Sequence, residues 1–369
     1  MIKNKKVIFL NLLPSPYRVD FFNELDKVCD LLVIYYFPML ENSPWKDSDK
    51  AHNYQYEYLF DSTKVNFGGL VKIVKILHKY RKEIIIVGGY AQLPEIISIF
   101  YLKLFGIKFS LNTDGGFVTK GFFKTIFKNL LIRSANYWLS SGKRASETLE
   151  FYGAKQAFIY EYHFTSLLKG EILSEPVKKT EVENLRKTLN LDKDTCYFIF
   201  VGQLIHRKGV DIMLASLTLT QNNKFEILVV GDGDQSSQLR EISILNKLNK
   251  RVHFLGKLSK KEVLDYLKVS DVFVFPSRDD IWGLVLNEAG SSGLPIITSE
   301  HVGSAYSLVE DGKNGYMVKN TPIEWANAID KITNQDMRKM GNESIKIAQK
   351  YSIEQMVQDH MILFSKLGA

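Results

Sequence analysis

The segment 272–299, VFVFPSRDDIWGLVLNEAGSSGLPIITS, constrains the fold of this chain more than any other part of it. It opens with an apolar run of β-branched and aromatic residues, 272–275, which is typical of a buried strand. A charged loop and a helical pattern follow, and Gly293 and Pro295 end that pattern before a second apolar run begins at Ile296. Strand, loop, helix and strand in this order form a βαβ unit, which predicts a parallel sheet in an α/β fold.

Two carboxylates flank the turn between the first strand and the helix: Asp280 precedes the helix and Glu288 lies within it. Ligands of parallel sheets bind at the carboxyl ends of the strands, beside helix N-termini whose free N–H groups suit a phosphate. Two acids would repel a simple anion, but they would hold hydroxyl groups on both sides of a diphosphate. The segment therefore predicts a nucleotide sugar as ligand, and the alternative is a pair of surface acids on an ordinary helix.

This arrangement resembles the E-x7-E motif of family 4 glycosyltransferases, which have the GT-B fold. The resemblance implies that Asp280 faces the transferred sugar and that Glu288 binds the ribose of the nucleotide. The backbone N–H groups of Trp282, Gly283 and Leu284 would meet the distal phosphate. The chain has Asp where the family has the first Glu, and this side chain, shorter by a methylene group, is expected to change which sugar is accepted or to weaken activity.

A second element begins with the strand-like run 197–201 and continues into a loop that contains Gly202, Gln203, Arg207 and Lys208. It resembles the family's GR…KG element, whose Arg and Lys hold the donor diphosphate. Lys208 matches the Lys of that element, Gln203 stands in place of its Arg, and Arg207 is expected to supply the missing charge. Two cations would offset the negative charge that builds on the leaving group. The alternative, a basic loop at a helix start, is unfavourable unless an anion binds there.

A third element, 251–277, resembles the family's base-binding turn, in which backbone groups near Gly256 and Leu258 would pair with the base. We expect UDP rather than GDP as the nucleotide. Recognition of the base by backbone groups leaves no signature in the side chains. The Asp-x-Asp sequence at 232–234 resembles the family's G-x-G turn, so no metal site is predicted. No cofactor is expected beyond the donor substrate.

The first half of the chain alternates apolar runs with helical patterns, which predicts a second doubly wound parallel sheet. The loop after the first run lacks the G-x-G-x-x-G pattern, so dinucleotide binding loses its main support. Arg18 is expected at the tip of this loop, where it would reach the diphosphate on domain closure; the alternative is an exposed arginine at a helix start. Asp114, followed by two glycines at a strand end, is predicted to contact the acceptor near the reacting sugar carbon, or else merely to form a turn.

The positive charge of the chain is concentrated in its first part. Residues 1–165 hold 22 Lys and Arg against 15 Asp and Glu, and 115–146 contain no acid. Within 117–138, phenylalanines lie on one face of a predicted helix beside a row of lysines. This pattern predicts an interfacial helix on an anionic membrane, with contacts from Lys120, Phe123, Lys124, Phe127 and Lys128.

The alternative for this segment is a core-facing helix with a solvated edge of lysines. Nucleic-acid binding is the other use of a basic patch, but no nucleic-acid module accompanies it, so no nucleic acid is expected as a partner.

A chain of 369 residues is long enough for two domains. The expected division is an acceptor-binding domain at 1–165, a donor-binding domain at 166–345 and a helix at 346–369 that crosses back to the first domain. The polar segment 165–195 is the predicted linker. The expected architecture is α/β, with two Rossmann-like domains of the GT-B type that face each other across a cleft.

The two cysteines, Cys29 and Cys196, give no disulfide framework and fit a reducing compartment. The first apolar run is interpreted as a strand rather than a signal peptide, and no run is long enough to span a membrane. The expected location is the cytoplasm, peripheral at the inner face of the cell membrane.

The resemblance implies a retaining, metal-independent glycosyltransferase, with Asp280, Lys208, Arg207 and Asp114 as the catalytic residues. It would transfer a hexose-type sugar from a UDP-sugar to a lipid-linked saccharide during surface-polysaccharide synthesis. The alternatives are a silent GT-B partner subunit that binds glycan, which Asp280 and Gln203 favour, and a GT-B epimerase or phosphorylase that acts on related sugars.

Overall fold

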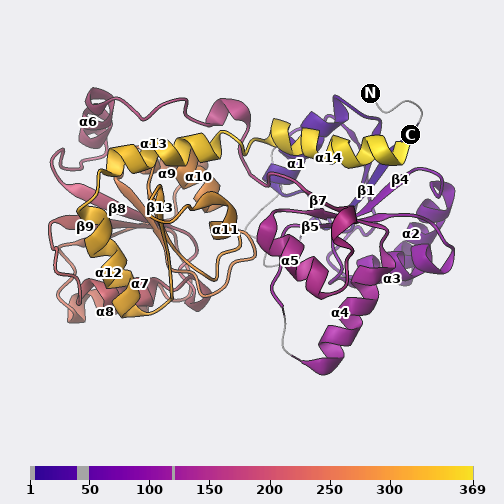
Figure 1. Cartoon of the computed structure of the whole chain (residues 1–369), viewed down its shortest axis with the longest axis horizontal. Coiled ribbons are helices and arrows are strands. Elements are labelled where there is room, and N and C mark those ends of the chain that lie inside the picture. Colours follow the sequence, from indigo (N-terminus) through magenta and orange to yellow (C-terminus); the bar gives the residue numbers. More distant parts are fainter. Residues whose placement is uncertain (1–4, 40–49, 119–120, 369) are drawn as a thin grey trace. The chain divides into compact units, whose positions relative to one another are not determined.

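The computed structural model describes residues 5–39, 50–118 and 121–368. The chain forms two compact units. Unit 1 consists of Met1–Leu168 together with Ser352–Ala369, and unit 2 consists of Lys169–Tyr351. Each unit is a parallel sheet with connecting helices (Figure 1).

The seven-stranded sheet of unit 1 has the order β3-β2-β1-β4-β5-β6-β7, and its strands are parallel. The strands are β1 (Val7–Asn11), β2 (Leu31–Tyr35), β3 (Gln55–Tyr58), β4 (Ile84–Val87), β5 (Ser110–Thr113), β6 (Tyr137–Ser140) and β7 (Ile159–Glu161). The helices are α1 (Pro16–Asp26), α2 (Phe67–Lys79), α3 (Leu93–Leu104), α4 (Phe122–Ser134), α5 (Lys143–Phe151) and α14 (Ile353–Gly368), with a short 3₁₀ turn η1 (Gln156–Phe158). The chain changes direction across the sheet between β1 and β4, which confirms the predicted doubly wound topology.

The six-stranded sheet of unit 2 has the order β10-β9-β8-β11-β12-β13, and its strands are also parallel. The strands are β8 (Cys196–Val201), β9 (Phe225–Val230), β10 (Val252–Gly256), β11 (Val272–Phe275), β12 (Ile296–Ser299) and β13 (Gly315–Val318). The helices are α6 (Lys179–Thr188), α7 (Val210–Leu217), α8 (Ser236–Leu245), α9 (Lys260–Val269), α10 (Val285–Ser291), α11 (Ala305–Leu308), α12 (Pro322–Thr333) and α13 (Met337–Ala348), with 3₁₀ turns η2 (Lys169–Glu171) and η3 (His206–Lys208).

The topology of unit 2 determines where its ligand site belongs. The direction of strand addition reverses between β8 and β11, whose residues are buried along most of their length. Ligands of doubly wound sheets bind at such a reversal, in the crevice beyond the carboxyl ends of the strands. The loops that follow β8 and β11 therefore lie where a ligand is expected, and they contain the two motifs with Lys208 and Asp280.

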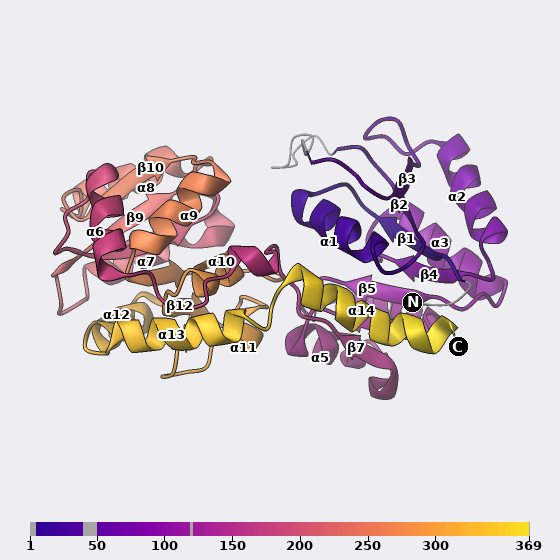
Figure 2. The same ribbon diagram turned by 90° about the horizontal axis from the view of Figure 1, so that it is seen from above.

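The last helix, α14, belongs to unit 1 and packs against α1, as both views show (Figures 1 and 2). The carboxylate of Asp359 accepts hydrogen bonds from the backbone N–H of His163 and from its ring Nδ1, both at 2.8 Å. The chain returns to unit 1 at Ser352 rather than at residue 346, because α13 still belongs to unit 2. No helix among the described residues has the length and apolar character needed to cross a membrane.

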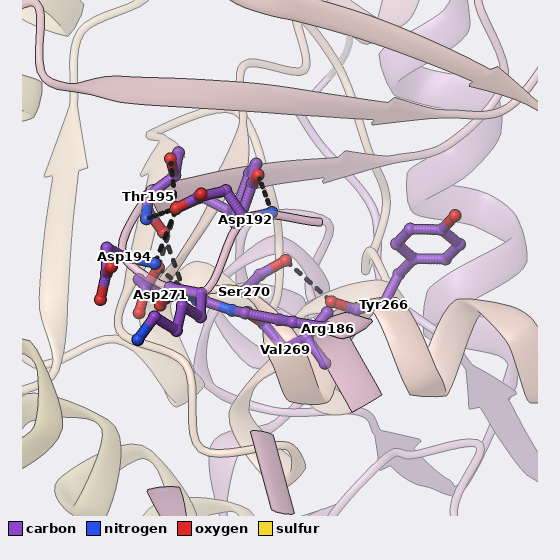
Figure 3. A network of polar contacts seen from close by, with 10 residues as sticks. Arg186, Asp192, Asp194, Thr195, Tyr266, Val269, Ser270 and Asp271 are labelled. Atoms are coloured by element: carbon purple, nitrogen blue, oxygen red, sulfur yellow. Dashed lines mark hydrogen bonds and ion pairs between the residues drawn. The ribbon is translucent and has the colours of Figure 1, made fainter. Parts of the chain in front are cut away.

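The predicted linker at 165–195 contains the crossing between the units, which lies between Leu168 and Lys169, but most of this segment is a folded part of unit 2. Unit 2 begins at Lys169, and this segment contains α6, whose Arg186 is only 5% exposed (Figure 3). The guanidinium forms an ion pair of 2.9 Å with Asp271. It also donates to three backbone carbonyls at 2.6–3.0 Å, those of Lys193, Thr195 and Val269. Polar sequence was mistaken for a linker because the residue that fixes this segment to the unit is a buried cation, not an apolar side chain.

Candidate functional site

The loops after β8 and β11 bring three of the predicted catalytic residues together. Lys208 lies in the turn η3 after β8, and its Nζ forms an ion pair with Oδ2 of Asp280 in the loop after β11. Arg207 lies beside them: its Nη1 donates to the carbonyl of Asp279 at 2.7 Å and is 3.9 Å from Oδ2 of Asp280. Two cations and a carboxylate therefore meet at the reversal point of the sheet.

The ammonium group of Lys208 is held in a partly dehydrated position. Its side chain is 11% exposed, and Nζ lies 4.9 Å from the centroid of the Phe275 ring at the end of β11. Burial lowers the pKa of Lys208, while the negative charge of Asp280 opposes this shift. A cation that is poorly hydrated and faces a strand end interacts strongly with an incoming anion, because less water must be displaced.

The two loops are joined by contacts that keep Lys208 in place. Gly209 has φ +70°, and a Cβ at this position would collide with the carbonyl oxygen of Pro276. The backbone N–H of Arg278 donates to the carbonyl of Arg207 at 2.8 Å. Arg278 also forms a two-pronged ion pair with Asp211 at 2.7 and 2.6 Å. Sequence reasoning missed this last pair, because the two residues belong to different βα loops.

The pairing with Arg278 lowers the pKa of Asp211 and so keeps its carboxylate charged. Burial alone would raise the pKa of Asp211, but the hydrogen bonds and charge of Arg278 outweigh burial, so the pKa is lowered overall. The Arg278–Asp211 pair therefore stays ionised near neutral pH and joins the loop after β11 to the first turn of α7. The role of this pair is structural, since each of its two charges is neutralised by the other.

The backbone of Asp280 is fixed by a short parallel bridge to Val302. Its N–H donates to the carbonyl of His301, and its carbonyl accepts from the N–H of Gly303, both at 3.0 Å. Trp282 is 5% exposed and its indole N–H donates to Oδ1 of Asn287 at 3.0 Å. The side chain of Trp282 is therefore held within unit 2, and its backbone carbonyl accepts from the N–H of Ser304 at 2.9 Å.

Helix α10 begins at Val285, with Leu284 as its N-cap residue. Gly283 adopts φ +86°, which requires glycine, and the backbone of 282–284 forms a turn ahead of the helix. Glu288 lies within α10 and is half-buried. The loop and this helix place the two acids in the same βα segment, at the carboxyl end of β11.

The remaining predicted donor-site residues line the same edge of the unit 2 sheet. Gly202 and the exposed Gln203 directly follow β8, and Gly256 ends β10 with φ +75°. The carbonyl of Gly256 accepts from the N–H of Gly231 at 2.8 Å, and a Cβ on Gly231 would collide with the carbonyl of Gly202. Leu258 is partly buried against the core. The loops are thus packed backbone against backbone, which leaves little room for side chains.

Unit 1 carries a separate polar cluster around Asp114, just beyond β5. Arg18 was expected at a loop tip, or else as an exposed arginine at a helix start; it lies within α1, which begins at Pro16, and is only 3% exposed. Its guanidinium pairs with Oδ1 of Asp114. The hydroxyl of Tyr162 donates to the same oxygen at 2.9 Å. Burial acts to lower the pKa of Arg18, but the negative charge of Asp114 opposes burial, and the pKa is raised overall.

Helix α4 exposes the apolar face that the sequence predicts, and its first turns project from the rest of unit 1 (Figure 1). Phe122 and Phe123 are 75% and 84% exposed, and Ile126, Phe127 and Leu130 are between 44% and 51% exposed. Lys124 is exposed and Lys128 is half-buried, whereas Lys120 lies outside the described residues. The alternative of a core-facing helix does not describe these side chains.

Comparisons with known proteins agree with this fold. Residues 181–351 match the family model described as Glycosyl transferases group 1. An uncharacterised glycosyltransferase of Methanocaldococcus jannaschii is 26% identical over 229 residues, which cover 58% of this chain and 64% of that protein. The O-antigen biosynthesis glycosyltransferase WclY of Escherichia coli is 34% identical over 116 residues, or 31% of this chain and 32% of that protein. In both relatives the match therefore spans less than two thirds of the protein's length.

Among solved structures, Anabaena HepE in complex with UDP aligns with a TM-score of 0.78 and 17% identity, covering 98% of this chain and 100% of that chain. This likeness concerns the fold, which is that of GT-B glycosyltransferases. Residues 181–351 therefore form a domain of the glycosyl transferases group 1 family, within a chain of GT-B fold.

Proposed function

We propose that this chain is a retaining glycosyltransferase that transfers a hexose-type sugar from a UDP-sugar to a lipid-linked saccharide, without a catalytic metal ion. The observation that carries the proposal is the meeting of Lys208, Arg207 and Asp280 at the reversal point of the unit 2 sheet. This is the position where a doubly wound sheet binds its ligand. UDP is supported as the nucleotide by the fold likeness to HepE, which was solved with UDP bound.

The chemistry follows from the charges in the loops. The diphosphate of the donor forms ion pairs with the ammonium of Lys208 and the guanidinium of Arg207 in place of Asp280. The carboxylate of Asp280 then accepts hydrogen bonds from the hydroxyls of the sugar. The bond between the anomeric carbon and the phosphate oxygen breaks, and the two cations stabilise the negative charge that the diphosphate gains. Glu288 holds the ribose, and the backbone N–H groups of 282–284 contact the distal phosphate.

Unit 1 supplies the acceptor side in this proposal. Asp114 is half-exposed, and its carboxylate takes up the proton of the acceptor hydroxyl as the hydroxyl oxygen bonds to the anomeric carbon. A lipid-linked saccharide is supported as the acceptor by the similarity to WclY, a protein of O-antigen biosynthesis, and by the apolar, basic surface of α4.

The donor site is tested by nucleotide binding. We expect saturating UDP to raise the melting temperature, because a ligand that binds only the folded state stabilises it by about 2.7 kcal/mol at a concentration 100 times its Kd. Glu288→Ala should remove this shift for UDP. Glu241→Ala, a change at an exposed glutamate of α8, should leave it unchanged. If UDP, GDP, CMP and their sugars all leave the melting temperature unchanged, the chain is a silent partner subunit rather than a transferase.

We also propose that α4 binds an anionic membrane surface, which places the chain peripherally at the inner face of the cell membrane. Phe123 and Phe127 would enter the headgroup region, and Lys120, Lys124 and Lys128 would attract anionic lipid. Burying one phenylalanine contributes about 1.5–3 kcal/mol, so two such side chains account for a substantial partition coefficient.

The membrane proposal predicts that Phe123→Ser with Phe127→Ser weakens binding to phosphatidylglycerol-containing vesicles by at least about tenfold. Flotation with vesicles measures this. Phe67→Ser is a control for the loss of an exposed phenylalanine, since Phe67 is 81% exposed but lies on α2 rather than on α4. Equal loss in both variants, or no vesicle binding by the unaltered chain, would contradict the proposal.

A further inference from the structure

Three donors converge on a single oxygen of Asp114. The guanidinium of Arg18 and the hydroxyl of Tyr162 both approach Oδ1, the latter at 2.9 Å. Nδ2 of Asn112, in β5, lies 3.4 Å from the same oxygen. Within the described part of the chain, every hydrogen bond of this carboxylate goes to Oδ1, and the side chain is 32% exposed. The other oxygen, Oδ2, is therefore the one available to a substrate hydroxyl.

Tyr162 is suited to hold the carboxylate in this orientation. Its side chain is 2% exposed, and its hydroxyl lies 3.0 Å from the carbonyl of Thr113 as well as 2.9 Å from Asp114. Burial raises the pKa of Tyr162, and the charge of Asp114 raises it further. The hydroxyl therefore keeps its proton over the working pH range and acts as a donor.

The C-terminal helix α14 also packs against this cluster, through His360. His360 of α14 is fully buried, and its ring packs against that of Tyr162 with centroids 4.6 Å apart. Its Nε2 lies 3.3 Å from Oδ1 of Asn112, and its Nδ1 lies 2.7 Å from the carbonyl of Met356. Burial lowers the pKa of His360 to about 4, so the ring is neutral near pH 7 and adds no charge beside Arg18.

We propose that Tyr162 is a positioning residue, which turns Oδ2 of Asp114 toward the acceptor hydroxyl, and that His360 of α14 supports it. The inference rests on the proposed role of Asp114. The proposal gives the last helix, α14, a function in the acceptor site. The carboxylate of Asp114 is oriented by residues that are far apart in the sequence and come from β5, from the segment after β7 and from α14. Since the hydroxyl of Tyr162 does not touch the substrate in this account, its effect must pass through Asp114.

The test is a double-mutant cycle in sugar transfer. Tyr162→Phe keeps the ring and removes the hydroxyl, and we expect kcat to fall about tenfold, in line with the loss of one buried hydrogen bond to a charged group. The KM for the UDP-sugar should stay within about twofold, because the donor binds to unit 2. In the Asp114→Asn background the same change should have no further effect, since interacting residues are not additive.

A matched control is Tyr35→Phe, which removes another buried hydroxyl of unit 1, one that is bonded to Tyr54 at 2.5 Å and makes no hydrogen bond to Asp114 among the described residues. It should leave kcat unchanged. Full activity of Tyr162→Phe, or an equal fold-loss with and without Asp114→Asn, would overturn the positioning role while leaving the transferase proposal intact. If Asp114→Asn itself transfers sugar at the normal rate, the proposed role of Asp114 fails, and the inference fails with it.

Discussion

Lys208→Met is expected to lower kcat/KM for the UDP-sugar by about 10²–10³-fold, the size of effect seen when one stabilising group for a developing negative charge is removed. Methionine keeps the apolar stem over the Phe275 ring and removes the charge together with the ion pair to Asp280, while the backbone contact between Arg207 and Arg278 still joins the two loops. Arg207 remains, but it is more exposed and lies 3.9 Å from Asp280, so it replaces the lost charge only in part.

The control for this change is Lys250→Met, at an exposed lysine of unit 2 just before β10. It should retain normal kinetics, because it removes the same charge from the unit without touching the site. Initial rates over a range of donor concentrations measure both variants. Normal kcat/KM in Lys208→Met would show that the diphosphate is not bound by the loop after β8.

Asp114→Asn is expected to lower kcat by roughly 10²-fold, the lower range of contributions from a group that receives a proton. It also leaves the buried guanidinium of Arg18 without its counter-charge, and breaking such a pair costs about 3 kcal/mol of unfolding free energy. Loss of activity alone would therefore be ambiguous between chemistry and instability.

A charge-balanced variant separates the two effects. Arg18→Met combined with Asp114→Asn removes both partners, and we expect it to recover stability to within about 1 kcal/mol, since apolar replacement of a buried ion pair is often neutral. Its activity should stay low. Urea unfolding and kcat are measured on the same preparations; recovery of kcat together with stability would contradict a role for Asp114 in the reaction.

Much of the fold was predictable from the sequence because the central strands are buried on both faces and form continuous apolar runs. β4 (Ile84–Val87) and β11 (Val272–Phe275) are examples, and both are fully buried. The edge strand β3 (Gln55–Tyr58) was not predicted, since most of its residues are exposed and it has no such run. The short strand β7 at the other edge was missed for the same reason.

The candidate donor site was predictable in part, because residues within one βα loop are close in sequence. Lys208 and Asp280 were predicted from their positions relative to strand ends and glycines, and they form an ion pair. Cross-loop partners such as Arg278 and Asp211 carry no local signal, because a surface arginine and a first-turn aspartate are common in α/β chains.

The acceptor-side cluster was the least predictable part. Arg18 was expected at the tip of a loop, whereas helix α1 begins at Pro16 and buries it. Tyr162 and His360 were not identified at all, because they reach Asp114 from segments 48 and 246 positions further along the chain. Only the fold brings these side chains together, and no periodicity in the sequence indicates it.

The most direct test of the central claim is transfer of a labelled sugar from UDP-sugars to a lipid extract that contains lipid-linked saccharides. The account predicts that the unaltered chain moves label from at least one UDP-sugar into the lipid fraction, and that Lys208→Met reduces this transfer by 10²-fold or more. Absence of transfer from every UDP-sugar, or transfer that Lys208→Met leaves unchanged, would contradict it.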